Sequence, residues 1–205
     1  MNFNQLANND SVEKTRKALL EKGYVVHVVE NKAEALEKIK GLIPAGASVM
    51  NGSSVTLEQV GLVEYLKGGA HGWNNLHEAI VKEGDKAKQS ALRKQALLAD
   101  HYFGSVHALT EAGEFVIASN TGSQLPHLVY SSKNLVLVAS TKKIVPTLAD
   151  GLKRLDEHVI PLEDVHMKEL YGMGTAKNKV LLFLGESPMT ARKVNIILVK
   201  EDLGF

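Results

Sequence analysis

The 205-residue sequence contains no cysteine. Disulfides, thiolate catalysis, cysteine-ligated zinc and cysteine-ligated iron–sulfur clusters are therefore excluded for this chain. Eight histidines are present, but no two have the i, i+4 spacing of a metalloprotease helix. We therefore expect no metal site and no cofactor. The less favoured alternative is a dispersed metal site in which histidines combine with Asp100 or Glu111.

The sequence also lacks a long apolar segment and an excess of charge of one sign. The apolar stretch 135–139 is far too short to cross a bilayer, and residues 1–10 lack the features of a signal peptide. The 24 basic and 23 acidic residues are interspersed and give a net charge of +1. This balance argues against nucleic acid or an anionic membrane as a partner, and we expect a cytoplasmic protein.

The first quarter of the sequence alternates between helical and strand patterns. The expected elements are a helix at 11–22, a strand at 24–29, a helix at 32–42 and a strand at 47–50. Gly23 is placed to end the first helix, and Asn31 to cap the second. This alternation is typical of a parallel sheet with crossover helices.

The remaining sequence predicts one α/β domain over residues 1–205, with a helical excursion around 74–103. The strand at 134–139 is the most apolar, so we expect it at the centre of the sheet. The other expected elements are helices at 57–66, 76–102 (broken near Gly84), 125–130, 146–155 and 164–170, a hairpin of 106–110 with 114–118, and strands at 179–184 and 193–200 that close the sheet.

Two polar, glycine-containing loops are candidates for ligand binding. The first, at 51–56, lies between a predicted strand and a predicted helix, where backbone N–H groups and hydroxyls can face an anion. The second, at 120–124, has the same arrangement. The candidate ligand-binding residues in the two loops are Gly52, Ser53, Ser54, Thr56, Thr121, Gly122 and Ser123. The alternative is that the loops only turn the chain and cap helices, with Thr56 as the first cap.

Lys142 and Lys143 follow the predicted central strand. Lys143 is a further candidate ligand-binding residue, because the carboxyl ends of parallel strands are where ligands usually bind. The alternative is a solvated turn.

Several segments resemble the LUD (lactate utilisation) domain family, also called DUF162. The first is Asn51-Gly-Ser-Ser-Val-Thr-Leu-Glu-Gln-Val-Gly-Leu62, and the second is Ala99-Asp-His-Tyr-Phe-Gly-Ser-Val-His-Ala-Leu-Thr-Glu-Ala-Gly-Glu114. The loop Asn120-Thr-Gly-Ser-Gln124, the segment 134–146 and the tail 192–205 follow in the family's order. The resemblance covers about residues 11–205.

The resemblance implies a NagB/RpiA/CoA transferase-like fold, which is a mostly parallel sheet flanked by helices. It also implies a role in the oxidation of lactate to pyruvate together with iron–sulfur partner proteins. In the related coenzyme A transferases, a glutamate followed closely by a glycine attacks the acyl group, and Thr110-Glu111-Ala112-Gly113 is similar. Glu111 is therefore the candidate catalytic residue, and its alternative is a solvated carboxylate at the hairpin turn.

Two departures from the family pattern bear on function. Many relatives carry a cysteine cluster where this sequence has 171–178 without one, and the usual Asn-Arg pair of the second loop is Ser123-Gln124 here. The missing guanidinium removes a bidentate partner for a carboxylate or phosphate. We expect either a pocket for a small anionic metabolite at the carboxyl ends of the strands, or a non-catalytic accessory subunit of iron–sulfur oxidoreductase partners. A homodimer is also expected, and enzymatic activity is left open.

Overall fold

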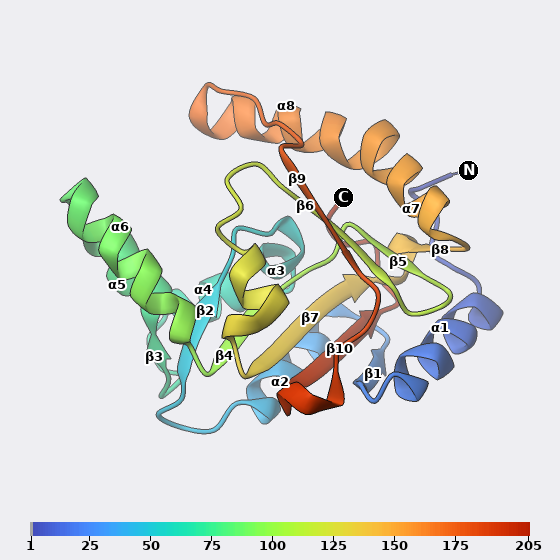
Figure 1. The fold of residues 1–205 in the computed structure, drawn as a ribbon, viewed down its shortest axis with the longest axis horizontal. Coiled ribbons are helices and arrows are strands. Elements are labelled where there is room, and N and C mark those ends of the chain that lie inside the picture. Colours follow the sequence, from blue (N-terminus) through green and yellow to red (C-terminus); the bar gives the residue numbers. More distant parts are fainter. Residues whose placement is uncertain (1) are drawn as a thin grey trace.

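The computed structural model describes residues 2–205, so residue 1 of the predicted domain lies outside the described residues. Its centre is a six-stranded sheet in which all five neighbouring pairs are parallel (Figure 1). The strands, in order across the sheet, are β1 (Val25–Val29), β10 (Lys193–Val199), β7 (Asn134–Ser140), β4 (His101–Gly104), β2 (Ser48–Asn51) and β3 (Asn74–Asn75). The predicted parallel α/β sheet and the central place of the 134–139 strand are confirmed.

Both faces of this sheet are buried. Successive residues of a strand point to opposite sides, so each face can be followed along β7. Val136 and Val138 of β7 pack in one apolar cluster with α2 (Lys32–Leu42), α3 (Val55–Gln59) and α4 (Leu62–Lys67). Leu135 and Leu137 pack in a second cluster with Leu19 of α1 (Asn9–Glu21) and with part of a second sheet. Burial on both sides explains why β7 is a continuous apolar run rather than an alternating one.

The second sheet has four strands and covers the α1 side of the first. The strands, in order, are β8 (Ile144–Val145), β5 (Ala108–Thr110), β6 (Phe115–Ser119) and β9 (Lys179–Phe183). β5 and β6 form the predicted antiparallel hairpin. The prediction that 179–184 closes the main sheet is wrong, because β9 pairs antiparallel with β6. β9 is a half-exposed edge strand, with Val180 40% and Leu182 41% exposed, whereas the interior strand β10 is mostly buried.

A helical run begins on the outer face of the second sheet, where α7 (Leu148–Arg154) and the wide π-helical turn η4 (Leu155–Val159) pack, and continues beyond it as α8 (Ile160–Tyr171). The two separate helices predicted at 146–155 and 164–170 are therefore joined. Pro161 follows the wide turn, and its ring and missing N–H are tolerated there because it lies in the first turn of α8.

The long helix predicted at 76–102 is the largest error. The structure has α5 (Leu76–Lys82), a break at Gly84 as predicted, α6 (Lys86–Gln95) and the short η1 (Ala96–Leu98), but His101 begins strand β4. Asp100 accepts hydrogen bonds from the backbone N–H and the hydroxyl of Ser48, which ties this segment to β2. The pairing of β4 with its neighbours β2 and β7 therefore overrides the local helical pattern. α6 itself has no buried residue and extends away from the sheets (Figure 1).

The helix predicted at 57–66 is also divided. α3 ends at Gln59 and α4 begins at Leu62, with Gly61 between them at a φ of +86°. This left-handed conformation favours glycine and cannot continue an α-helix.

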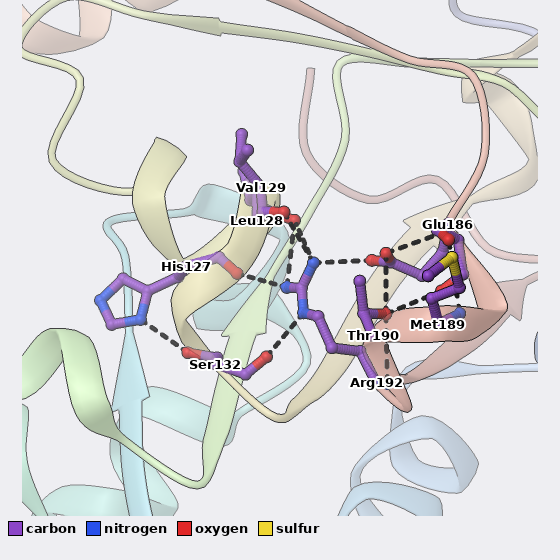
Figure 2. Close-up of polar contacts among 9 residues, drawn as sticks. His127, Leu128, Val129, Ser132, Glu186, Met189, Thr190 and Arg192 are labelled. Carbon is purple, nitrogen blue, oxygen red and sulfur yellow. Dashed lines mark hydrogen bonds and ion pairs between the residues drawn. The ribbon is translucent and has the colours of Figure 1, made fainter.

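The helix predicted at 125–130 is a π-helical turn, η2 (His127–Ser131), and a buried arginine holds it. The Arg192 side chain is only 3% exposed, and its guanidinium donates to the carbonyl oxygens of His127 at 2.6 Å, Val129 at 2.9 Å and Ser132 at 2.9 Å. Figure 2 shows these contacts around η2. Glu186 balances its charge at 2.6 Å, just before the turn η5 (Pro188–Thr190). Arg192 thus satisfies carbonyls at the end of η2 that would otherwise lack partners. Within residues 2–205, no helix is long and apolar enough to span a membrane.

Candidate functional site

A cavity of about 670 Å³ lies where the main-sheet strands β2, β4 and β7 end, facing α8. This volume is within the range of small-molecule pockets. Ser105 and His107 enter it after β4, and Lys143 after β7, from the turn η3 (Thr141–Lys143). Arg93 reaches it from α6. The cavity therefore occupies the edge of a parallel sheet at which ligands usually bind.

Most of the predicted ligand-binding residues line this cavity. They are Gly52, Ser53, Ser54, Thr56, Thr121, Ser123 and Lys143. Gly122 is not among the lining residues: its φ is +87°, and a Cβ on it would lie 2.8 Å from Cδ of Lys179. The structure therefore brings the two loops together, although it does not place Gly122 in the wall.

The first loop contributes a close backbone approach and a hydroxyl. A Cβ on Gly52 would lie 2.5 Å from the Tyr102 hydroxyl, so only glycine fits without a shift. Ser54, not Thr56, caps α3, by accepting from the Leu57 N–H at 3.4 Å. Because α3 has only five residues, its dipole adds little, and the argument for an anion depends on the side chains instead.

Lys143 is the buried cation of the site. Its ammonium donates to the hydroxyls of Thr56 (2.8 Å) and Ser105 (3.1 Å), and the side chain has no carboxylate partner among residues 2–205. The residue is 3% exposed, so the predicted alternative of a solvated turn is wrong for Lys143. Burial, with the nearby charges of Arg154 and Lys142, holds the pKa of this lysine well below its usual value. The neighbouring Lys142 differs, because it forms an ion pair with Asp202.

A second buried cation, Arg154, lies behind this wall. Its side chain is fully buried and donates to the backbone carbonyl of His107, while Nε and Nη2 have no partner in the part of the chain that the structure describes. Burial lowers the pKa of the guanidinium to about 10. Lys143 and Arg154 are the two buried basic side chains on this side of the cavity, and no buried carboxylate within residues 2–205 pairs with either.

His107 was not among the residues that the sequence patterns singled out for the site. In the structure it lines the cavity, and its Nδ1 accepts a hydrogen bond from the Ala118 N–H at 3.1 Å. Burial and the charges of Lys143 and Arg154 lower the pKa of the imidazole to about 3. One feature of the sequence could have indicated that His107 belongs to the site: it follows Gly104, at the end of a buried strand, by three residues.

The wall formed by α8 was not predicted from the sequence. Glu163, His166, Met167 and Tyr171 line the cavity, and their spacing places them on one face of the helix. Burial raises the pKa of the Glu163 carboxyl. Glu163 thus supplies an acidic side chain to the cavity wall. The helical spacing of these four residues is the signal in the sequence that could have identified this wall.

Glu111, the predicted catalytic residue, does not line the cavity. It lies in the turn between β5 and β6, where its carboxylate pairs with Lys14 at 2.5 Å and accepts from the Ser11 hydroxyl at 2.7 Å. These two contacts with α1 lower the pKa of the carboxyl. The structure therefore does not bring Glu111 together with the two loops, and its geometry indicates that it anchors α1. Residues 2–205 also contain no group of three or more histidine, aspartate or glutamate residues that could hold a metal ion.

Comparison with known proteins agrees with this architecture. The solved structure of a DUF162 family protein from Deinococcus radiodurans is similar to this fold, with a TM-score of 0.59 over 95% of this chain and 99% of that chain. The two sequences are 13% identical, so the likeness shows the fold alone. No curated protein matches this sequence. The sequence model of the LUD domain matches residues 12–171, which is most of the chain. The chain therefore belongs to the LUD domain family.

Proposed function

We propose that this LUD domain protein serves organic-acid utilisation linked to lactate, and that its cavity binds a small anionic metabolite, either a carboxylate or a phosphate. The observation that carries the proposal is Lys143, a cation in the cavity wall whose hydrogen-bond partners are two neutral hydroxyls. A buried charge without an opposite charge is costly. An anion in the cavity would offset that cost, and the nearby charge of Arg154 would add to the attraction.

The remaining walls suit a small polar ligand. Ser53, Thr121 and Ser123 supply hydroxyls from the two loops, and Arg93 supplies a further positive charge from α6. This arginine offers a guanidinium even though the second loop lacks the one found in many relatives. Glu163 on the opposite wall, with its raised pKa, is a group that could exchange a proton with a bound ligand.

A thermal-shift screen tests the proposal with lactate, pyruvate, sugar phosphates and coenzyme A esters. A ligand that binds only the folded state raises the melting temperature by mass action. At a ligand concentration one hundred times the Kd, the free energy of unfolding increases by about 2.7 kcal/mol. We expect at least one of these anions to stabilise the wild type and the Lys142→Met variant, but not Lys143→Met. Lys142→Met is the matched control, because the Lys142 ammonium pairs with Asp202 instead of the cavity hydroxyls. The absence of a shift with every anion would refute the proposal.

The second candidate function is a non-catalytic accessory subunit of iron–sulfur oxidoreductase partners. Exposed apolar side chains on α8 favour it: Leu162 is 40%, Val165 55% and Leu170 57% exposed. Exposed apolar surface of this kind is typical of a contact with another chain. Sedimentation of the protein with purified iron–sulfur oxidoreductase subunits tests it. The complex should form with the wild type and weaken with Val165→Glu, whereas self-association alone would indicate the homodimer expected from the sequence.

A further inference from the structure

The backbone fixes the tautomer of His107. The Ala118 N–H donates to Nδ1 at 3.1 Å, and only an unprotonated ring nitrogen can accept such a bond. In a neutral imidazole the proton is then on Nε2. A backbone contact on one side of the ring thus determines what the other side offers.

The Nε2–H is left without a partner in the described part of the protein. This nitrogen has no hydrogen-bond partner among residues 2–205, and it is not one of the buried unpaired side-chain atoms of that range. The residue lines the cavity, so this unpaired nitrogen is the one available to a ligand there. Burial and the charges of Lys143 and Arg154 lower the pKa of the ring to about 3, which keeps the imidazole neutral near physiological pH.

Two hydrogen-bond donors of different kinds therefore line one cavity. Lys143 is the donor suited to an anionic group, and it lies close enough to His107 for its charge to lower the pKa of the ring. A neutral, fixed N–H carries no charge that needs an anion, and it can donate to an uncharged oxygen such as a carbonyl or a hydroxyl. A carboxylate with an oxygen on the neighbouring carbon presents both groups.

We propose that His107 is a specificity-determining residue whose Nε2–H donates to an uncharged oxygen beside the anionic group of the ligand. The cavity then prefers 2-hydroxy and 2-oxo acids to carboxylic acids that lack the second oxygen. This inference rests on the proposed function, because it requires an anion at Lys143.

Titration calorimetry with a matched pair of ligands and a matched variant tests it. Pyruvate and propionate share the carboxylate, but only pyruvate has the 2-oxo oxygen. In His107→Asn, the amide oxygen can still accept from the Ala118 N–H, while no donor remains at the Nε2 position. We expect the wild type to bind pyruvate about tenfold more tightly than propionate, the value of one hydrogen bond. His107→Asn should bind the two acids equally, with an unchanged affinity for propionate.

The outcomes separate this inference from the proposed function. Equal binding of both acids by the wild type, or a preference for pyruvate that persists in His107→Asn, overturns the role of His107 and leaves the anion site intact. Binding of neither acid also overturns it, and the proposed function fails only if the wider anion screen fails as well. Nitrogen-15 NMR of the wild type gives a test that needs no variant: Nε2 should carry the proton at neutral pH, and a proton on Nδ1 would refute the inference.

Discussion

The ammonium of Lys143 and the hydroxyl of Thr56 lie 2.8 Å apart, although the two residues are 87 positions apart in the sequence. The contact joins the end of β7 to the loop after β2, and Ser105 after β4 donates to the same Thr56 hydroxyl at 3.3 Å. Three neighbouring segments of the site are therefore linked through a buried charge. This arrangement has a cost in stability, which the first prediction makes measurable.

Lys143→Met should make the protein more stable at neutral pH, by about 1 kcal/mol, because it removes a buried cation that has no opposite charge. The pKa of this lysine is lower in the folded state than its ordinary value of 10.5, so the folded state binds fewer protons than the unfolded state between the two values. The stability of the wild type therefore rises with pH across that window, and the advantage of the variant shrinks towards pH 10.5. Urea unfolding over a pH series measures the effect. A variant less stable than the wild type at pH 7 contradicts the prediction.

Glu111→Gln should weaken the attachment of α1 without affecting ligand binding. The carboxylate pairs with Lys14 and Ser11, so we expect a loss of about 1 kcal/mol. Because these contacts lower the pKa of the carboxyl below 4.5, their stabilisation is present above pH 4.5 and is lost as the pH falls through the folded-state value. Urea unfolding and calorimetry check the two parts, with Glu13→Gln on the exposed side of α1 as the control. Loss of ligand binding or turnover at unchanged stability would instead support the catalytic role predicted from the sequence.

Gly52→Ala should destabilise the protein by about 1 to 3 kcal/mol, because its Cβ would lie 2.5 Å from the Tyr102 hydroxyl. Tyr102 cannot move easily: it is 2% exposed, and its ring stacks on His127 with the centroids 4.4 Å apart. Gly84→Ala is the control, since no atom lies within 4 Å of the added Cβ there. Adding Tyr102→Phe to Gly52→Ala should restore part of the stability in thermal unfolding. No recovery in the double variant would show that the hydroxyl is not the source of the strain.

Arg192→Lys should cost about 2 to 3 kcal/mol even though the charge is kept. A lysine ammonium cannot reproduce the fork that reaches His127, Val129 and Ser132 at once (Figure 2). Hydrogen exchange should accelerate first in η2, which follows the second loop. Arg16→Lys, at a 40% exposed side chain, should change stability little. Equal unfolding free energies for Arg192→Lys and the wild type would show that the network contributes nothing.

Local sequence patterns correctly predicted the helices that bury one regularly spaced apolar face and the strand that is buried on both faces. α2 matches its prediction at both ends, and β7 was placed at the centre from its apolar run alone. The patterns failed where a distant segment decides the structure. β4 was hidden in a helical pattern, because its pairing with β2 and β7 is a property of the assembled sheet.

The site shows the same division. Serine, threonine and glycine in the two loops were found because strand exits are visible in the sequence, and Lys143 was found for the same reason. His107 acquires its meaning from the Ala118 N–H and from two cations elsewhere in the chain, and no local pattern shows those contacts. Glu111 was chosen by analogy, and only the tertiary structure reveals its partners on α1.

α6 contributes Arg93 to the cavity wall, although none of its residues is buried. Elements with little buried surface open at a free energy well below that of global unfolding. The part of the cavity wall that α6 forms can therefore unfold locally while both sheets remain folded. We therefore expect variants of the α5–α6 junction to change the residence time of a bound ligand without changing the melting temperature.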